Sequence, residues 1–383
     1  MSAEADTHLE QHSSSDTATC NSAKIVNALN VRQCIHNKEI KLREPANIGY
    51  YSLERAGVTT LKYNEDLSQL KYLYLPTEKK FCFDLTDGYS NQFECEHSVE
   101  GLSNLLKWVL NNKYKFEVAN SNHSDKSLNT DFICFRGLLS LILNTPYERK
   151  EDWCIHAVKF NGTIYMLAKL TERRLREEEN KSEYAQKASF GGYRFEEYVC
   201  TEKQNNPPRT QLIDGLNRNE FNVVFRSRLN SHSLVYGAEV DCIKPNGDPK
   251  KLDFVEIKTT KEFENKRQHD TFCRYKALKW WSQSYLAGIK TIVCGYRDDN
   301  FHVQRVDTYS ANSLCNLGAE FWNSSVCLNF LDSFLTFVKK CVTKEDQNIT
   351  YEFYWSPNSN EIVCKELMLQ DAIIPQWFRD FFQ

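Results

Sequence analysis

The sequence has no excess of positive charge. Its 383 residues carry 48 lysines and arginines against 51 aspartates and glutamates, so the net charge is −3. A balance of this kind argues against a protein that holds nucleic acid by a broad basic surface. It leaves open a local site in which a few charges are placed together.

The acidic bias comes from the first 22 residues, which contain four acids and neither lysine nor arginine. Because this segment has almost no apolar side chains, burial cannot offset the entropy that it would lose on ordering. We therefore predict a disordered acidic tail over residues 1–22. We predict a single domain over residues 23–383, which carries +1 once the −4 of the tail is set aside.

The sequence also lacks the run of about 20 apolar residues that a membrane helix needs. Its start has neither the basic residues nor the apolar stretch of a secretion signal. We therefore expect a soluble intracellular protein with no membrane partner. The 14 cysteines are never closer than twelve positions, and no Cys-x-x-Cys occurs. This spacing argues against zinc ribbons and redox dithiols, so we expect reduced cysteines in the core.

Motifs of several common enzymes are missing. There is no GxxxxGK[ST] or GxGxxG phosphate loop, no GxSxG serine nucleophile and no HExxH zinc motif. The nine histidines are scattered, and none is paired at the spacing of metal ligands. The chemistry that remains open is that of carboxylates.

Short β-patterned runs are mixed with helical patterns along the chain. The runs at 163–170, 222–229 and 291–297 predict strands, and 98–112 predicts a helix. The charge run at 171–187 has acids and bases three to four residues apart, which predicts a solvated helix. Because strands often follow strands through short turns, we predict an α/β domain with mixed rather than doubly wound parallel sheets.

One stretch concentrates carboxylates. Residues 237–260 contain two β-patterned runs around the turn sequence KPNGDPKK, which predicts an antiparallel hairpin. One register sets Asp241 opposite Glu256 and Glu239 opposite Lys258, with all four side chains on one face. Such cross-strand neighbours lie about 5 Å apart at Cβ.

Three carboxylates this close repel one another, and one lysine cannot neutralise them. Oxygen-ligated Mg²⁺ or Mn²⁺ would resolve the conflict. Two such ions, about 4 Å apart, could activate water and stabilise a leaving oxygen at phosphorus. An acid followed fifteen positions later by Glu-x-Lys matches the PD-(D/E)XK nuclease core. A surface hairpin with a cross-strand ion pair is the alternative, and this pattern alone leaves it open.

A helix after the hairpin offers further polar groups. It is predicted from its cap at Asp270 to Gly288 and carries Lys276, Lys279 and Gln283 on one face. This face could meet phosphates, or it could simply be solvated. Upstream, the segment GYRFEEY contains a glutamate at position 196, a fourth carboxylate that could reach a metal directly or through water.

Taken in order, these motifs match a known family. The sequence resembles the DXO decapping exoribonucleases, whose active site is an embellished PD-(D/E)XK-like site. The resemblance covers most of residues 40–380, and the animal type is the one that it resembles. The matching segments are FDLTDGY at 83–89, EGLSNLLKW at 100–108, ICFRGLLSLILNTPYER at 133–149, GYRFEEY at 192–198, RSRLNSH at 226–232, GAEVDC at 237–242, VEIKT at 255–259, LKWWSQSYLAGI at 278–289 and SVCLNF at 325–330. It implies two packed mixed β-sheets with surrounding helices and one catalytic domain over 23–383.

The resemblance also implies residue roles. The implied metal-site residues are Glu196, Glu239, Asp241, Glu256 and the main-chain carbonyl of Ile257. The implied catalytic residues are Glu239, Asp241, Glu256, Lys258 and Gln283, with the lysine facing the scissile phosphate. The implied substrate contacts are Glu100, Arg136, Glu239, Lys258 and Gln283. Two family contacts are not clearly reproduced, because the arginine expected in SLERAGVTT is ambiguous and Asn222 stands where a cysteine is expected.

The activity that the resemblance implies is metal-dependent hydrolysis at RNA 5′ ends, with Mg²⁺ or Mn²⁺ and two ions in the site. Family members remove pyrophosphate from 5′-triphosphates, release incomplete, unmethylated or NAD caps, and degrade RNA 5′→3′ in RNA quality control. We expect a monomer in the nucleus or cytoplasm. Some fungal members stimulate a 5′→3′ exoribonuclease, a partner that this sequence does not show. A catalytically weak activator of such an enzyme and a DNA nuclease are the alternatives.

Overall fold

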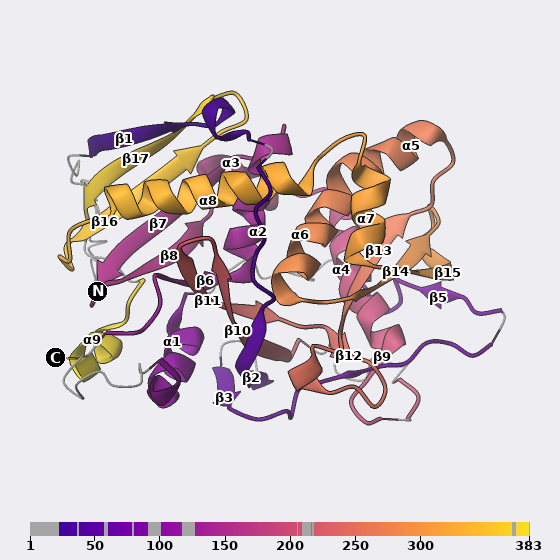
Figure 1. Ribbon diagram of the computed structural model, residues 1–383. Coiled ribbons are helices and arrows are strands. Elements are labelled where there is room, and N and C mark those ends of the chain that lie inside the picture. Colours follow the sequence, from indigo (N-terminus) through magenta and orange to yellow (C-terminus); the bar gives the residue numbers. More distant parts are fainter. Residues whose placement is uncertain are drawn as a thin grey trace, which may run out of the picture.

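Two mixed β-sheets make up the framework of the molecule, and helices cover their faces (Figure 1). This computed structural model describes residues 23–36, 38–56, 60–78, 80–90, 101–116, 127–204, 206–208, 216, 218–369 and 373–382. The tail predicted at 1–22 lies outside these ranges. Within them, the predicted α/β class with mixed sheets and surrounding helices is confirmed.

The larger sheet has ten strands among the described residues, in the order β1-β17-β16-β7-β8-β6-β11-β10-β2-β3. Strand β6 is parallel to both of its neighbours, β11 and β8, and the other pairs are antiparallel. In sheet order, the strands are Lys24–Asn30, Glu361–Met368, Ile349–Trp355, Trp153–Phe160, Thr163–Lys169, Phe132–Phe135, His232–Glu239, Glu220–Leu229, Ala46–Ala56 and Thr60–Asn64.

The smaller sheet has seven strands in the same described part of the chain, in the order β5-β15-β14-β13-β12-β4-β9. The pairs β13–β14 and β12–β4 are parallel, and the others are antiparallel. In sheet order, the strands are Phe83–Asp84, His302–Tyr309, Thr291–Arg297, Phe254–Lys261, Cys242–Ile243, Tyr72–Leu73 and Cys200–Thr201.

The predicted elements are found where they fall on described residues. The three predicted strands are β8, β10 and β14, and the predicted helix at 98–112 is α1 in its described part. The charge run forms two helices rather than one, because Asn180 ends α3 and the Ser182 side chain caps α4 by accepting from Ala185 N. The helices α1 to α9 span Ser103–Asn111, Arg136–Asn144, Glu172–Glu179, Glu183–Val199, Lys266–Thr271, Ala277–Ala287, Ala311–Gly318, Ser324–Cys341 and Gln376–Phe382.

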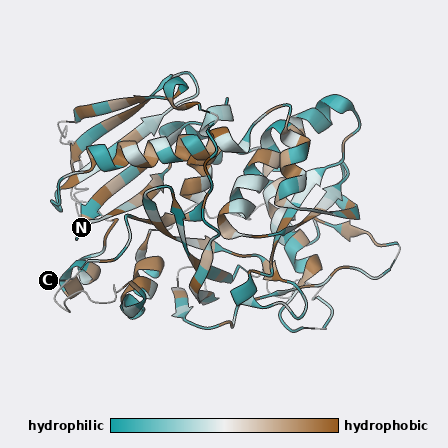
Figure 2. Ribbon diagram, viewed as in Figure 1, coloured by the Kyte–Doolittle hydropathy of each residue, from teal (hydrophilic) through white to brown (hydrophobic). Residues whose placement is uncertain are grey.

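One hydrophobic core joins the two sheets. It includes Phe225 of the larger sheet, Phe254 of the smaller sheet and the inner faces of α2, α6 and α8. In Figure 2 the hydrophobic residues follow the strands and these inner helices, whereas α5 is hydrophilic. The described cysteines are unpaired and all but Cys82 and Cys315 are buried, which confirms the predicted core role. Helices α2 and α6 thus stand where the two sheets meet.

Candidate active site

The predicted hairpin register is present in the middle of the smaller sheet, where β12 pairs with β13. Cys242 pairs with Val255 in antiparallel register, which sets Asp241 opposite Glu256 as predicted. The turn is closed by a hydrogen bond from Gly247 N to Lys244 O, of 2.9 Å. The carboxylate Oδ2 of Asp241 accepts from the backbone N–H of Ile257 at 2.5 Å. The first carboxylate is therefore fixed against the second strand.

The predicted pairing of Glu239 with Lys258 is wrong. Glu239 is the last residue of β11 in the larger sheet, where it lies opposite Asn222. The chain then passes from one sheet to the other at Val240 and Asp241, so the hairpin ladder covers only β12. Glu239 thus approaches the other acids from a different sheet.

Glu256 is enclosed and fully paired. Its side chain is 1% exposed, Oε2 accepts from Arg136 Nη1 at 2.9 Å, and Oε1 accepts from Lys258 Nζ at 2.6 Å. Burial alone would raise the pKa of Glu256, but the two cations outweigh it and lower the pKa to about 2. Glu256 therefore stays ionised, and Lys258 is held beside it.

The remaining acids carry more negative charge than their surroundings balance. Burial, followed by repulsion from Glu256, raises the pKa of Asp241 to about 6. Burial, followed by repulsion from Glu220 and Asp241, raises the pKa of Glu239 to about 8, although its side chain remains exposed to solvent. The pKa of Glu196 is raised well above its usual value by burial and by Asp241. A further positive charge in the site would stabilise the ionised forms of these acids.

Helix α4 brings Glu196 to this cluster. The neighbouring Phe195 is buried against the smaller sheet, where a Cβ on Gly295 would lie 2.7 Å from its ring. Glycine at 295 therefore lets the ring lie directly on β14. The position of Glu196 is set by this close contact between helix and sheet.

Sequence reasoning missed one cation of the site, Lys71. It lines a cavity of about 170 Å³ together with Glu196 and Glu197. Burial opposes the charge of Lys71, but Glu196 and Glu197 raise its pKa overall. Lys71 reaches this place because its carbonyl accepts from Ile243 N at 2.9 Å, beside the parallel pairing of β4 with β12. No motif in the sequence around Lys71 predicts such a pairing, because the two strands are far apart in the sequence.

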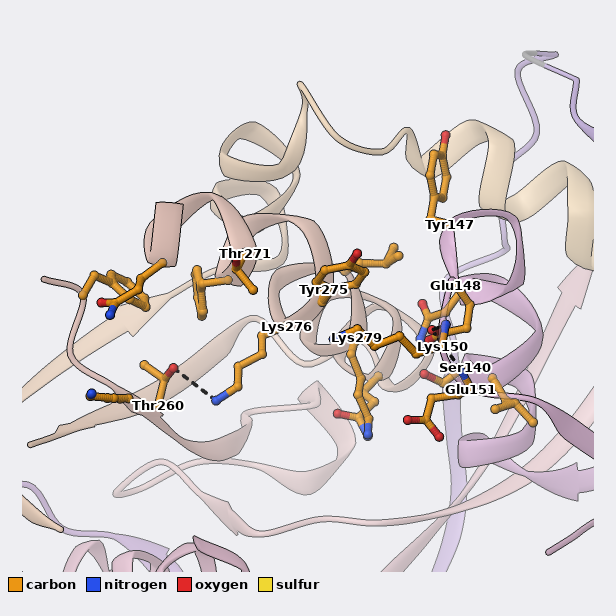
Figure 3. A pocket seen from close by; sticks show the side chains of 18 of the residues that line it. Ser140, Tyr147, Glu148, Lys150, Glu151, Thr260, Thr271, Tyr275, Lys276 and Lys279 are labelled. Atoms are coloured by element: carbon orange, nitrogen blue, oxygen red, sulfur yellow. Dashed lines mark hydrogen bonds between the residues drawn. The ribbon is translucent and has the colours of Figure 1, made fainter. Parts of the chain in front are cut away.

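A larger cavity, of about 1070 Å³, is lined by none of the four carboxylates, but its lining includes Gly137, next to Arg136 in the chain, and Thr260, two residues after Lys258. Lys276, Lys279 and Gln283 all line it, as their predicted common helix face requires, and Figure 3 shows the two lysines pointing into it. Lys276 Nζ donates to Thr260 Oγ1 at 3.2 Å, drawn as a dashed line. Burial lowers the pKa of both lysines, helped for Lys279 by the nearby Lys258. The polar face therefore lines a cavity, and Lys279 lies near Lys258 of the carboxylate site.

The predicted start of this helix is wrong, whereas its end is confirmed. Asn265, not Asp270, is the cap: its side chain accepts from Gln268 N at 3.0 Å, and α5 then runs to Thr271. A π-turn over Phe272–Lys276 (η5) joins α5 to α6, which ends at Gly288 with φ +64°. The sequence could not show the earlier start, because Asp270 is as good a capping residue as Asn265. Such π-turns are frequent at functional sites.

Arg136 is the first residue of α2, and its side chain is 10% exposed. Its guanidinium points to Glu256, and the acids Glu256 and Asp241 raise its pKa against the effect of burial. Its observed contact is thus with a carboxylate of the site. The preceding residue, Phe135, offers no side-chain cap to the helix, and Gly137 in the first turn lines the large cavity.

The other expected substrate contacts have different outcomes. Glu100 lies outside the described residues. In SLERAGVTT, Arg55 Nη2 pairs with Glu220 Oε1 at 3.3 Å. Asn222 is buried, and its Nδ2 donates to Glu220 Oε2 at 3.3 Å.

The four acids are the kind of ligand that a hard divalent cation prefers, although no three of them offer oxygens that all lie within 4.8 Å of one another in the described structure. Glu196, Glu239, Asp241 and Glu256 offer oxygen ligands, which suit Mg²⁺ and Mn²⁺ rather than soft metals. Burial is the largest cause of the raised pKa of Glu196, Glu239 and Asp241, and repulsion between acids adds to it, so a bound cation would stabilise their ionised forms. The carbonyl of Ile257 belongs to the same strand as Glu256.

None of the helices in the described ranges has both the length and the hydropathy of a membrane span.

Comparisons with known proteins agree with this geometry. The family profile described as RAI1 like PD-(D/E)XK nuclease matches residues 43–379. The curated decapping and exoribonuclease protein of Xenopus laevis is 31% identical over 348 residues, which cover 88% of this chain and 85% of that protein.

Solved structures share the fold. Candida albicans Rai1 in complex with pU5-Mn²⁺ gives a TM-score of 0.77 at 21% identity, covering 94% of this chain and 99% of that one. Scheffersomyces stipitis Rai1 in complex with (3′-NADP)⁺ and calcium ion gives 0.75 at 21% identity, covering 89% and 96%. With a family profile that spans most of its length and relatives above 30% identity, the chain belongs to the RAI1-like PD-(D/E)XK nuclease family.

Proposed function

We propose that this protein is a divalent-metal-dependent hydrolase of RNA 5′ ends. The observation that carries the proposal is the meeting of Asp241, Glu256 and Lys258 beside a cavity lined by cationic and amide side chains. The similar Xenopus protein is named for decapping and exoribonuclease activity, and Candida albicans Rai1 was solved with pU5-Mn²⁺. These names support RNA 5′ ends as the substrate class.

Four carboxylates and one carbonyl would hold the metal. These ligands are Glu196, Glu239, Asp241, Glu256 and the main-chain oxygen of Ile257. We propose Mg²⁺ as the resident ion, with Mn²⁺ as a substitute and two ions in the site, because hydrolysis at phosphorus needs one ion to activate water and another to stabilise the leaving oxygen. When bound, such ions supply the charge that activates water and stabilises a leaving oxygen at phosphorus.

The protein's own cations would hold the phosphate. Lys258 Nζ is fixed by Glu256 and keeps 22% of its side chain exposed, so it can face a scissile phosphate without leaving that ion pair. Arg136 would keep Glu256 in place from the other side and contribute positive charge toward the RNA backbone. The enzyme would thereby orient phosphate and carboxylates before any reaction begins.

The large cavity would receive the substrate beyond the reacting phosphate. Gln283, Lys279 and Lys276 follow one another along one face of the η5–α6 segment. In Figure 3 Tyr275 lies near Lys279 on the same wall, which offers an aromatic surface beside the cations. The first turn of α2, at Gly137, adds backbone N–H groups that can bind phosphate. Such walls suit a nucleotide chain better than a small metabolite.

The finer features remain part of the proposal. We propose that triphosphate, incomplete-cap and NAD-cap ends are accepted. The Scheffersomyces stipitis Rai1 complex with (3′-NADP)⁺ supports a nucleotide-cofactor end. We also propose that residues 23–383 act as one catalytic domain, as a monomer in the nucleus or cytoplasm, with Glu100 at the substrate pocket. An exoribonuclease partner is not needed for this chemistry.

A side-by-side assay tests the proposal. Wild-type protein is incubated with Mg²⁺ or Mn²⁺ and RNA that carries a triphosphate, GpppN, methylated-cap, NAD-cap or monophosphate 5′ end. Products are expected from at least the triphosphate or incomplete-cap RNA, and Asp241→Asn and Glu256→Gln should each abolish them. If wild type binds RNA but yields no product with either metal, it is a binding or activating protein instead. A preference for matched DNA would overturn the substrate class.

A further inference from the structure

A second group of metal-ligating side chains lies on the larger sheet, away from the carboxylate site. Cys154 and His156 are two apart on β7, so both side chains point to the same face. Glu352 on β16 is directly opposite His156 in the antiparallel register. Strands β7 and β16 lie side by side in Figure 1 although they are far apart in the sequence. Histidine spacing alone therefore gives no sign of this group.

The distances suit one small cation. Cys154 Sγ lies 3.8 Å and His156 Nε2 lies 3.6 Å from the same carboxylate oxygen, Glu352 Oε2. The three ligand atoms all lie within 4.8 Å of one another. In a tetrahedral zinc site with bonds of about 2.0 to 2.3 Å, ligand atoms are about 3.3 to 3.6 Å apart. Both distances to Glu352 Oε2 therefore lie within about 0.5 Å of that spacing, and the distance between the thiol and the imidazole is at most 4.8 Å.

The two carboxylate oxygens of Glu352 have different neighbours. Oε1 accepts from Lys365 Nζ at 3.4 Å, which leaves Oε2 toward the thiol and the imidazole. Lys365 can hold the carboxylate from behind, as partners in the outer shell of metal sites do. His156 Nδ1 is buried and meets no hydrogen-bond partner among the described residues. The ring atom that faces Glu352 Oε2 is Nε2, so Nε2 would be the metal ligand and Nδ1 would point away from the metal.

We propose that Cys154, His156 and Glu352 form a second metal site that binds Zn²⁺ and links β7 to β16. Sulfur, nitrogen and oxygen ligands together favour zinc over Mg²⁺, and a solvent molecule would take the fourth position. Burial, followed by Glu352, raises the pKa of the Cys154 thiol to about 12, so the metal-free thiol is protonated and its proton leaves as the metal binds. The site is independent of the proposed RNA chemistry.

Cobalt spectroscopy on the full-length protein tests this site. Co²⁺ is added in saturating Mg²⁺, which keeps the oxygen-rich site occupied. One equivalent is expected to give a thiolate-to-cobalt charge-transfer band, and Zn²⁺ should abolish it by competition. Cys154→Ser should remove the band and lower Zn²⁺ affinity at least roughly tenfold. His156→Gln should weaken binding as well.

Cys82→Ser is the matched control, because Cys82 is an exposed free cysteine on another part of the chain. This variant should keep the band. The site is refuted if wild type shows no band, or if the band survives Cys154→Ser. RNA 5′-end hydrolysis with Mg²⁺ is measured on the same samples and should be unchanged in Cys154→Ser. Loss of the band with intact hydrolysis in that variant identifies the zinc site, whereas inactive wild type with an intact band contradicts only the proposed RNA activity.

Discussion

The substitution Asp241→Asn separates a metal ligand from a structural ion pair. In the fold, Asp241 accepts from Ile257 N and faces Glu256, so its ionised form is opposed by a like charge. Asparagine keeps the size and can still accept from the amide, but it removes the charge. We expect an inactive protein that is as stable as wild type or slightly more stable in metal-free buffer.

The magnitude follows from the pKa of Asp241, which rises from 3.8 to about 6. A carboxyl with a raised folded pKa destabilises the fold as pH rises from 3.8 through 6, and the whole penalty is present at pH 7. The difference between these two pKa values corresponds to a penalty of about 3 kcal/mol as an upper limit, and the partial exposure of Asp241 to solvent reduces that penalty. Weakening the charge-assisted bond to Ile257 N costs about 1 kcal/mol. The net effect is therefore a gain of about 0 to 2 kcal/mol.

Divalent metal should reverse this order. At a concentration about 100 times Kd, a ligand that binds only the folded state adds about 2.7 kcal/mol. Wild type gains this stability from Mn²⁺ or Mg²⁺, whereas Asp241→Asn has lost a ligand and gains little. Urea unfolding at pH 7, with EDTA and then with metal, measures both effects for each protein.

Asp131→Asn serves as the control. Asp131 also accepts from a backbone amide, Ser233 N at 2.7 Å, and pairs with Lys339 at 2.9 Å, but it lies outside the carboxylate site. Its loss should lower stability by about 1 kcal/mol and leave the response to metal intact. If Asp241→Asn instead loses more than about 2 kcal/mol in EDTA, Asp241 is a structural acceptor and the ligand assignment is wrong.

Three further variants test other parts of the site. Gly295→Ala would place a Cβ 2.7 Å from the Phe195 ring, so urea unfolding should show a loss of stability of about 2 kcal/mol. Hydrolysis should fall as well, because α4 shifts. Gly192→Ala is the control, and it should be neutral or stabilising because the space around Gly192 is open. Lys258→Ala should reduce hydrolysis about 100-fold while calorimetry shows nearly unchanged metal binding, and a large loss of metal affinity would contradict its phosphate-facing role. Lys279→Gln should lower the salt slope of RNA binding by about 0.7, and an unchanged slope would exclude a phosphate contact. Because burial lowers the pKa of Lys279, wild-type RNA binding should also weaken as pH rises toward that pKa.

The sequence predicted most of what local patterns determine. The register of Asp241 with Glu256 follows from a strong turn and two β-patterned runs, and it is present. The common face of Lys276 and Gln283 follows from helical periodicity and survives the π-turn, because both residues still line one cavity. The helix cap was predicted at the wrong residue, because Asp270 is as well suited to the role as Asn265 and only the packed structure selects Asn265.

What the sequence could not supply is the place where the chain changes sheets. The β-patterned run that contains Glu239 and Asp241 looks continuous in the sequence. In the structure, however, strand β11 of the larger sheet ends at Glu239, and strand β12 of the smaller sheet begins at Cys242. That crossing brings acids from two sheets together without pairing Glu239 to Lys258. Lys71 arrives by the same kind of long-range event, a parallel pairing of two-residue strands. In a mixed two-sheet fold, the four acids and their cations therefore come together only when both sheets have formed. These contacts join residues far apart in the sequence, so local sequence patterns do not predict them.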